Sequence, residues 1–260
     1  MPIKSNYRIK GDMDGKITEL AQMIRESNSI VFYGGAGVST ESGVKDYRSE
    51  DGLYNTVKEY GVSPEEILSH DFFVRDPKTF YDFYRNYFLC DAKPNAAHFA
   101  LAELEKMDKL KAVITQNIDG LHQAAGSKNV LELHGTVKKY YCSGCGCDCG
   151  DVSLIISAGE LPRCKRCGGI IKPRVVLYGE MLDETVIEKA IRAIESADML
   201  IVGGTSLAVS PANTFVRCFM GKYAVMINQT STDYDRRAQL IIRDKIGTVL
   251  SAVMKELERK

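Results

Sequence analysis

The amino-acid sequence predicts an α/β fold in which a parallel sheet is covered by helices on both faces. Short apolar runs rich in β-branched residues recur along the 260 residues, each bounded by glycine, asparagine or other polar residues. Segments with apolar residues at three- and four-residue spacing lie between most of these runs. Nearly continuous apolar strands that alternate with helices are typical of a parallel sheet buried on both faces.

Strands and helices can be placed in order along the chain. Strands are expected at 29–36, 111–118, 129–135, 198–205 and 223–229. Helices are expected at 17–27, 95–107 and 184–197. Two stretches interrupt the alternation: residues 48–91 are rich in tyrosine, phenylalanine and charge, and residues 138–173 contain most of the cysteines. We expect these two stretches to form one smaller domain beside a large domain made of residues 1–47, 92–137 and 174–260.

The composition argues against several classes of protein. The 34 basic residues equal the 34 acidic ones, so we expect no broad basic field that could hold nucleic acid. No apolar run approaches the roughly 18 to 20 residues needed to span a bilayer, and the polar N-terminus lacks the apolar region of a secretory signal. We therefore expect a cytoplasmic protein without nucleic-acid or membrane partners. In that reducing compartment, clustered cysteines are more often metal ligands than disulfides.

Six of the eight cysteines fall in one short segment, residues 142–167. Two Cys-x-x-Cys pairs with 18 residues between them predict a zinc site whose ligands are Cys142, Cys145, Cys164 and Cys167. Glycine follows the second thiol of both pairs, which favours these four, although Cys147 and Cys149 offer competing pairs. Four thiolates fill the tetrahedral shell of zinc and leave no position for water. The predicted site is therefore structural, and the chemistry must lie elsewhere.

Polar loops follow all five predicted strands, at the edge where parallel α/β sheets bind ligands. The loop GGAGVSTESGVKDYRS (34–49) places Gly35 and Gly37 where backbone amides could approach a pyrophosphate. It is not a complete G-x-G-x-x-G motif, because the next glycine, Gly43, lies too far along the chain. The other loops are TQNIDGLH (115–122), LHGT (133–136), GGTSLAVSP (203–211) and NQTSTD (228–233). Together these loops predict a dinucleotide-binding site.

These motifs resemble those of the sirtuin family of NAD-dependent protein-lysine deacylases, and of its bacterial members in particular. The resemblance runs from about residue 17 to about residue 255 and keeps the family order: GAGVSTESG, DYRS, TQNIDGLH, LELHG, the two Cys-x-x-Cys pairs, GTSL and VMIN. It implies a Rossmann-like doubly wound large domain, a smaller helical and zinc-binding domain, and a substrate cleft between them.

The resemblance also implies an activity. NAD would be consumed to remove acetyl or other neutral acyl groups from protein lysines, yielding nicotinamide, free lysine and 2′-O-acetyl-ADP-ribose. The implied partner is an acetylated-lysine protein or peptide. NAD-dependent ADP-ribosyl transfer to protein is the alternative, because it would use the same cofactor and differ only in the acceptor.

Site residues follow from the resemblance position by position. His134 matches the catalytic base, and Asn117 is the second catalytic residue. The implied cofactor-binding residues are these two with Gly35, Ala36, Gly37, Ser39, Thr40, Asp46, Tyr47, Arg48, Gln116, Ile118, Asp119, Gly204, Thr205, Ser206, Asn228, Gln229 and Ile246. Among them, Asp119 would accept a hydrogen bond from the carboxamide, and Asn228 would help to hold the adenosine half. The implied substrate-binding residues are Val176, Leu177, Tyr178, Gly179, Glu180 and Val209.

The acyl preference is predicted from the aromatic stretch at 80–88, which fits either plain core or the lining of an acyl channel. Sirtuins that favour succinyl- or malonyl-lysine carry a tyrosine and, three residues later, an arginine; the matching positions are Tyr84 and Tyr87. A tyrosine hydroxyl cannot supply the charge-assisted pair that makes carboxylate recognition strong. We therefore expect neutral acyl substrates, acetyl first. The other candidates are interpreted as structural: His98, His122, Cys90 and Cys218.

Overall fold

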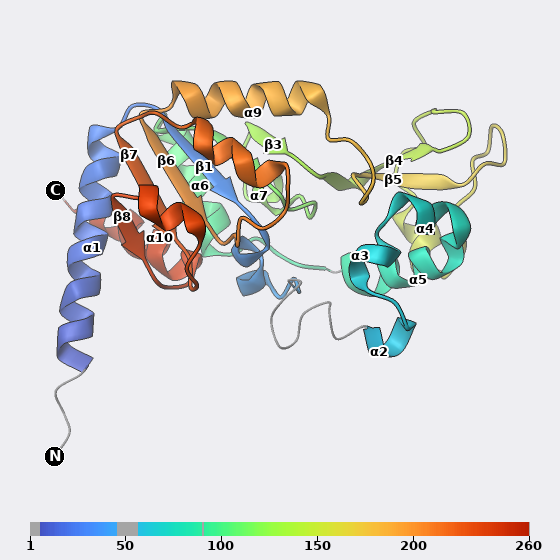
Figure 1. Ribbon diagram of the computed structural model, residues 1–260, viewed down its shortest axis with the longest axis horizontal. Helices are drawn as coiled ribbons and strands as arrows, with labels where there is room; N and C mark the ends of the chain where they lie inside the picture. The colour runs from blue at the N-terminus through green and yellow to red at the C-terminus, as the bar shows by residue number, and fades with distance from the viewer. Residues whose placement is uncertain (1–5, 46–56, 90, 260) are drawn as a thin grey trace, which may run out of the picture.

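The computed structural model describes residues 6–45, 57–89 and 91–259, which Figure 1 shows as a ribbon. The predictions made for Asp46, Tyr47, Arg48 and Cys90 lie outside these residues. Among the described residues, no helix combines the length and the apolar character that crossing a membrane requires.

A parallel sheet lies at the centre of the larger part of the molecule, and its six described strands run in the order β3-β2-β1-β6-β7-β8. These strands are β1 (Ile30–Gly34), β2 (Leu110–Thr115), β3 (Val130–Glu132), β6 (Met199–Gly203), β7 (Tyr223–Ile227) and β8 (Leu240–Ile242). If the strands of this sheet alone are numbered along the chain, their order is 3-2-1-4-5-6, which is that of a doubly wound dinucleotide-binding fold. The predicted fold class is confirmed. The sequence does not predict β8, because its three residues are too few to stand out as an apolar run.

Helices cover both faces of this sheet (Figure 1). One face carries α1 (Asn6–Glu26), α6 (Ala96–Lys106) and α10 (Ile246–Glu258). The other face carries α9 (Glu184–Ser196) and the 3₁₀ helix η4 (Ala212–Cys218). Successive residues of β1 show the division, since Phe32 lies in the first core and Tyr33 in the second. The short connecting elements are η1 (Ala36–Val38), η2 (Thr40–Ser42), α7 (Leu121–Ala124) and η5 (Asp233–Arg237).

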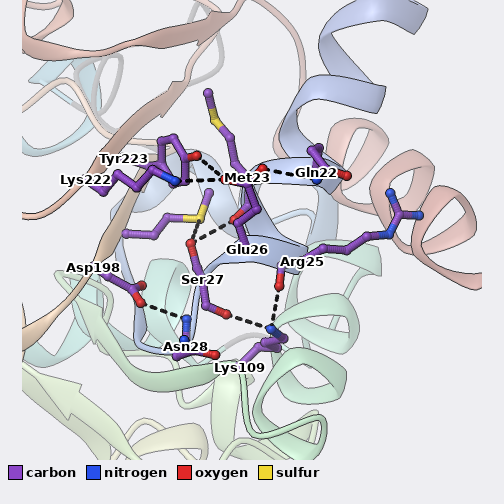
Figure 2. Close-up of polar contacts among 11 residues, drawn as sticks. Gln22, Met23, Arg25, Glu26, Ser27, Asn28, Lys109, Asp198, Lys222 and Tyr223 are labelled. Atoms are coloured by element: carbon purple, nitrogen blue, oxygen red, sulfur yellow. Dashed lines mark hydrogen bonds and ion pairs between the residues drawn. The ribbon is translucent and has the colours of Figure 1, made fainter.

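Polar contacts hold the edge of the sheet that is remote from the strand carboxyl ends (Figure 2). The Asp198 carboxylate, just before β6, accepts a hydrogen bond from the backbone N–H of Asn28 at 2.7 Å. The Lys109 ammonium, just before β2, donates to the carbonyls of Arg25 and Ser27 at 2.9 and 2.7 Å. A cation at the carboxyl end of a helix satisfies carbonyls that lack helical partners. These contacts tie the end of α1 to the starts of β2 and β6, the two strands that flank β1.

A second hydrophobic core lies to the side of the large sheet, on the right of Figure 1. It is built by α2 (Val57–Tyr60), α3 (Pro64–Ile67), α4 (His70–Arg75), α5 (Pro77–Phe88), α8 (Ser153–Ser157) and the antiparallel strands β4 (Gly135–Cys142) and β5 (Ile171–Val175). Side chains of Ser63, Ser69 and Asp76 cap α3, α4 and α5, which explains the short helices. We propose that this core defines the small domain. Its expected boundaries at residues 138 and 173 fall within β4 and β5.

Candidate active site

A cavity of about 930 Å³ lies at the carboxyl ends of the large sheet and extends to the second core. It is lined by the loops that follow β1 and β6, between which the strand order reverses, the ligand-binding position of doubly wound folds. Its main lining segments are 36–37, 39–41, 44–45, 116–119, 175–182, 204–206, 209–211, 227–231 and 244–246. His134 and the aromatic side chains of Phe80, Tyr84, Tyr87 and Phe88 also line it. The volume is at the upper end of the range for small-molecule sites.

Two glycines allow the loops after β1 and β6 to pack closely. The Gly37 N–H donates to the Gly204 carbonyl at 2.8 Å, and a Cβ on Gly37 would lie 2.8 Å from the Gly204 Cα. Gly35 is buried and does not line the cavity; a Cβ there would lie 2.8 Å from the Gln116 side-chain oxygen. The glycines therefore make room for protein neighbours, and an approach of backbone amides to a pyrophosphate stays a prediction.

Three polar side chains from two loops form one network at the cavity wall. The Ser39 hydroxyl donates to the Asp119 carboxylate at 2.7 Å and accepts from the Asn117 amide at 3.0 Å. The other Asp119 oxygen accepts from the Leu121 N–H at 2.9 Å, which holds the carboxylate against the start of α7. Ser39 is buried, so this network fixes the relative positions of the loops after β1 and β2.

A second network joins the loops after β2, β6 and β7. The Thr205 hydroxyl donates to the Gln116 side-chain oxygen at 3.1 Å, and the Gln116 amide donates to the Tyr33 hydroxyl at 3.0 Å. The Asn228 amide binds the Thr205 backbone through both of its atoms, accepting from the N–H at 3.0 Å and donating to the carbonyl at 2.7 Å. Asn228 thus holds the loop after β6 with its amide.

His134 sits just before β4 with one ring nitrogen fixed. Its Nδ1 lies 2.9 Å from the Gln116 backbone carbonyl, and because a carbonyl only accepts, Nδ1 carries the proton. The neutral ring then leaves Nε2 as a base. Burial lowers the pKa of His134 below its ordinary value, and the hydrogen bond to the carbonyl opposes this only partly. The ring is therefore neutral at physiological pH.

Two further histidines pack together behind the cavity. The rings of His98 and His122 are buried, and their centroids lie 4.7 Å apart. His98 accepts from the Asn95 N–H and completes the cap of α6, while the Asn95 amide donates to the Val38 carbonyl at 2.8 Å. Burial lowers the pKa of His98 to about 4 and that of His122 to about 3, so both are neutral. Their structural interpretation fits this position.

The segment 176–180 forms the cavity wall on the small-domain side. The Val176 N–H donates to the His134 carbonyl at 2.9 Å, which places this segment beside the histidine. One Glu180 oxygen accepts from the Leu177 N–H and the Lys172 ammonium, both at 2.9 Å, and the other lies 2.9 Å from His70 Nδ1. Burial would raise the pKa of the Glu180 carboxyl, but these donors outweigh it and lower the pKa. The carboxylate holds the turn in shape.

The aromatic stretch at 80–88 belongs to the second core and also lines the cavity. Tyr84 is buried, its hydroxyl lies 3.4 Å from that of Tyr140, and its ring also lines the cavity. The Tyr87 hydroxyl donates to the Glu59 carboxylate at 2.9 Å. Arg85 pairs with Asp82 and does not line the cavity. This end of the cavity is therefore mainly aromatic and apolar.

The four predicted zinc ligands come together outside the cavity, at the end of β4. Their sulfur atoms all lie within 4.8 Å of one another, with 3.4 Å between those of Cys142 and Cys167 and 3.9 Å between those of Cys145 and Cys164. Tetrahedral coordination at the usual Zn–S length separates sulfurs by about 3.8 Å. The four thiols therefore fit one zinc ion.

The structure gathers nearly all the described candidate residues in one place. Every described residue expected to bind cofactor or substrate lines the cavity, except Gly35. Lining residues that the sequence reasoning does not identify include Glu41, Lys45, Asp244 and Lys245. The Glu41 carboxylate accepts from the Gly247 N–H at 2.7 Å, which joins the first loop to the start of α10. Asp244 and Lys245 give no signal because they follow β8, and Glu41 depends on a contact 206 residues away.

Fold and site together define a dinucleotide-binding α/β protein with a basic histidine in its ligand cavity. The Sir2 family model matches residues 35–211. The NAD-dependent protein deacetylase of Clostridium perfringens is 53% identical over 244 residues, which cover 93% of this chain and 100% of that protein. That of Clostridium acetobutylicum is 52% identical over 240 residues, covering 92% and 98%. The chain belongs to the Sir2 family and resembles its bacterial members.

Solved structures of Sir2 enzymes match more than nine-tenths of the chain. One, from a study of Sir2 mechanism and regulation, has a TM-score of 0.86 and 39% identity, covering 95% of this chain and 99% of its own. Another, a Sir2 complex with a p53 peptide and NAD⁺, has a TM-score of 0.81 and 36% identity, covering 92% and 97%.

Proposed function

We propose that this chain is an NAD-dependent protein-lysine deacetylase. The observation that carries the proposal is the position of His134: a neutral imidazole, oriented by the Gln116 carbonyl, in a cavity shared by a dinucleotide-type sheet edge and the small domain. The Clostridium relatives named as NAD-dependent protein deacetylases support it, as does the Sir2 complex with a peptide and NAD⁺.

The lining residues fit NAD in their chemistry. Hydroxyl and amide groups of Ser39, Thr40, Asn117 and Ser206 supply hydrogen-bond partners for ribose, phosphate and carboxamide, while Ile118 and other apolar side chains suit the rings. The described residues assigned to cofactor binding, apart from Gly35, line this one cavity, and Asn228 holds Thr205 in place. In this proposal Gly35 leaves room for Gln116 and Thr205, and Asn228 holds Thr205, so both residues position neighbours that line the cavity.

When bound, NAD would supply an electrophilic ribose carbon to which the acyl oxygen of the substrate could add as nicotinamide leaves. The Ser39, Asn117 and Asp119 network would orient the residues proposed to bind that ribose. Nε2 of His134 then removes a proton from a ribose hydroxyl, because Nδ1 is already committed to the Gln116 carbonyl. The segment 176–180, held by Glu180, positions the acetyl-lysine beside that histidine.

One assay separates deacetylation from ADP-ribosyl transfer. The protein is incubated with an acetyl-lysine peptide, with and without NAD, and peptide mass and free nicotinamide are measured together. We expect the peptide to lose its acetyl group only when NAD is present, with one nicotinamide released for each acetyl lost. A peptide that keeps its acetyl group and gains the mass of ADP-ribose would support the alternative activity and contradict the proposal.

The pH dependence of deacetylation should reflect His134. The ordinary pKa of histidine is about 6.5. Because the pKa of His134 is lowered, its imidazole is neutral at pH values above about 6.5 and stays neutral somewhat below that pH. We expect kcat/KM to fall on the acid side with an apparent pKa below about 6.5, measured on an acetyl-lysine peptide. An acid limb centred above pH 7 would contradict the assignment.

Acid unfolding must be excluded in the same pH series. The pKa values of His98 and His122 are depressed in the folded protein, so the stability that they contribute is present above about pH 6.5 and is lost as the pH falls toward 4. Circular dichroism at each pH distinguishes this loss from titration of His134.

Acyl choice follows from the apolar end of the cavity. Tyr84 and Tyr87 direct their hydroxyls to Tyr140 and Glu59, and Arg85 pairs with Asp82, so none of them offers a free charged donor to a distal carboxylate. Charge-assisted hydrogen bonds contribute about 1.5–3 kcal/mol each. We expect acetyl-lysine to exceed succinyl-lysine in kcat/KM by about tenfold or more on matched peptides. A preference for succinyl would contradict this and would make Lys45, which lines the cavity beside Tyr87, the first candidate for the carboxylate partner.

We further propose an acetylated-lysine protein or peptide as the partner and the cytoplasm as the compartment. Equal numbers of acidic and basic residues support the absence of nucleic-acid binding. A cluster of free thiols with metal-site spacing is more common in a reducing compartment.

A further inference from the structure

Two cysteines lie beside the four predicted zinc ligands and are not among them. Cys147 and Cys149 are half-buried, and the Cys147 sulfur lies 3.4 Å from that of Cys145 and 3.6 Å from that of Cys164. The Cys149 sulfur lies 4.0 Å from that of Cys147. Six thiols therefore form one continuous cluster, and the four predicted ligands use only one side of it.

The backbone fixes both extra sulfurs against this cluster. The Cys147 carbonyl accepts from the Cys142 N–H at 2.9 Å, and the Cys149 N–H donates to the Tyr140 carbonyl at 3.1 Å, so this segment runs alongside β4. In an extended segment, residues two apart point to the same side. Accordingly Asp148 is exposed, whereas Cys147 and Cys149 pack against the second core.

The spacing of these sulfurs fits a second metal ion. The sulfurs of Cys147, Cys149 and Cys164 lie within 4.8 Å of one another, and two of their separations, 3.6 and 4.0 Å, bracket the value of about 3.8 Å for thiolates around zinc. Cys164 belongs to both groups, so its thiolate would bridge two ions. The two added thiolate charges equal the charge of a second dication, so the net charge of the cluster does not change.

We propose that Cys147 and Cys149, together with a bridging Cys164, form a second site for a thiophilic d¹⁰ cation, Zn²⁺ in the first instance. Soft thiolates select such ions. Three protein thiolates leave one coordination position open to solvent or an external ligand, which distinguishes this site from the closed four-cysteine site. The proposal goes beyond deacetylation and does not depend on it.

The alternative is that Cys147 exchanges with Cys145 around a single ion. The sulfurs of these two residues are close enough for that, and the sequence also leaves it open. Metal stoichiometry separates the two arrangements, because exchange needs one ion and bridging needs two.

The test is the metal content of the full chain after saturation with Zn²⁺ or Cd²⁺ and removal of excess by gel filtration. The wild type and the control variant Cys218→Ser, whose cysteine lies outside the cluster, should hold two ions per chain. The double variant Cys147→Ser/Cys149→Ser should hold one and keep its thermal stability.

With ¹¹³Cd, two coupled resonances should appear in the wild type and a single resonance in the double variant, since the Cys164 sulfur links the ions. One ion per chain in the wild type, or two in the double variant, would overturn the proposal. Loss of all metal from the double variant would also overturn it and would place Cys147 in the four-thiolate site.

Discussion

Replacing His134 with alanine is expected to lower kcat/KM for deacetylation by about 10²–10⁴-fold, the usual contribution of a positioned general base. The side chain is half-buried and makes one described side-chain hydrogen bond, to the Gln116 carbonyl, so its removal should leave the fold and the zinc content intact. Initial rates on an acetyl-lysine peptide, with zinc analysis and circular dichroism on the same samples, measure both effects.

Nicotinamide exchange provides the internal control for this variant. Exchange precedes the step that needs a base, so His134→Ala should retain much more of it than of deacetylation. Deacetylation near the wild-type rate would remove His134 from the mechanism. Equal loss of both reactions would instead indicate a binding role.

Replacing Cys142 with alanine is expected to abolish zinc binding at the four-cysteine site and to unfold the small domain. Cys142 is fully buried, and its backbone joins β4 to the segment that carries Cys147. Structural zinc contributes about 10–16 kcal/mol of binding free energy in zinc-finger peptides, and this becomes folding free energy. Thermal unfolding should shift strongly downward, and deacetylation should be lost with it because residues 175–182 line the cavity.

Cys218→Ala is the matched control, since this half-buried cysteine lies in η4 on the large sheet. It should keep its zinc and its activity. A Cys142→Ala protein that keeps its thermal stability but loses turnover would contradict the structural role and would imply that zinc takes part in the chemistry.

The sequence predicts the parallel sheet well because strands buried on both faces read as apolar runs, as in 29–36 and 198–205. The helix α10 is missing from the helices expected above. Its apolar residues Ile246, Val249, Leu250 and Val253 do recur at helical spacing, and they enter the core. The sequence also does not reveal that α1 begins at Asn6, because the first part of that helix is polar and lacks a continuous apolar stripe.

The site residues are predicted in position more completely than in role. His134 and the loop after β2 stand at strand ends, where topology alone brings them together. The actual contacts of Asn228 and Glu180 were not predictable, because their partners Thr205 and His70 lie 23 and 110 residues away. Hydrogen bonds between distant segments depend on loop geometry, which local patterns do not encode.

The fate of the acetyl group tests the central claim most directly. A peptide carrying ¹³C-acetyl-lysine is incubated with NAD and the protein, and the labelled products are separated and weighed. If the protein is an NAD-dependent deacetylase, the label should leave the peptide and appear first in acetyl-ADP-ribose, in an amount equal to the nicotinamide released. Label that appears directly as free acetate without NAD consumption, or that stays on a peptide modified with ADP-ribose, would contradict it.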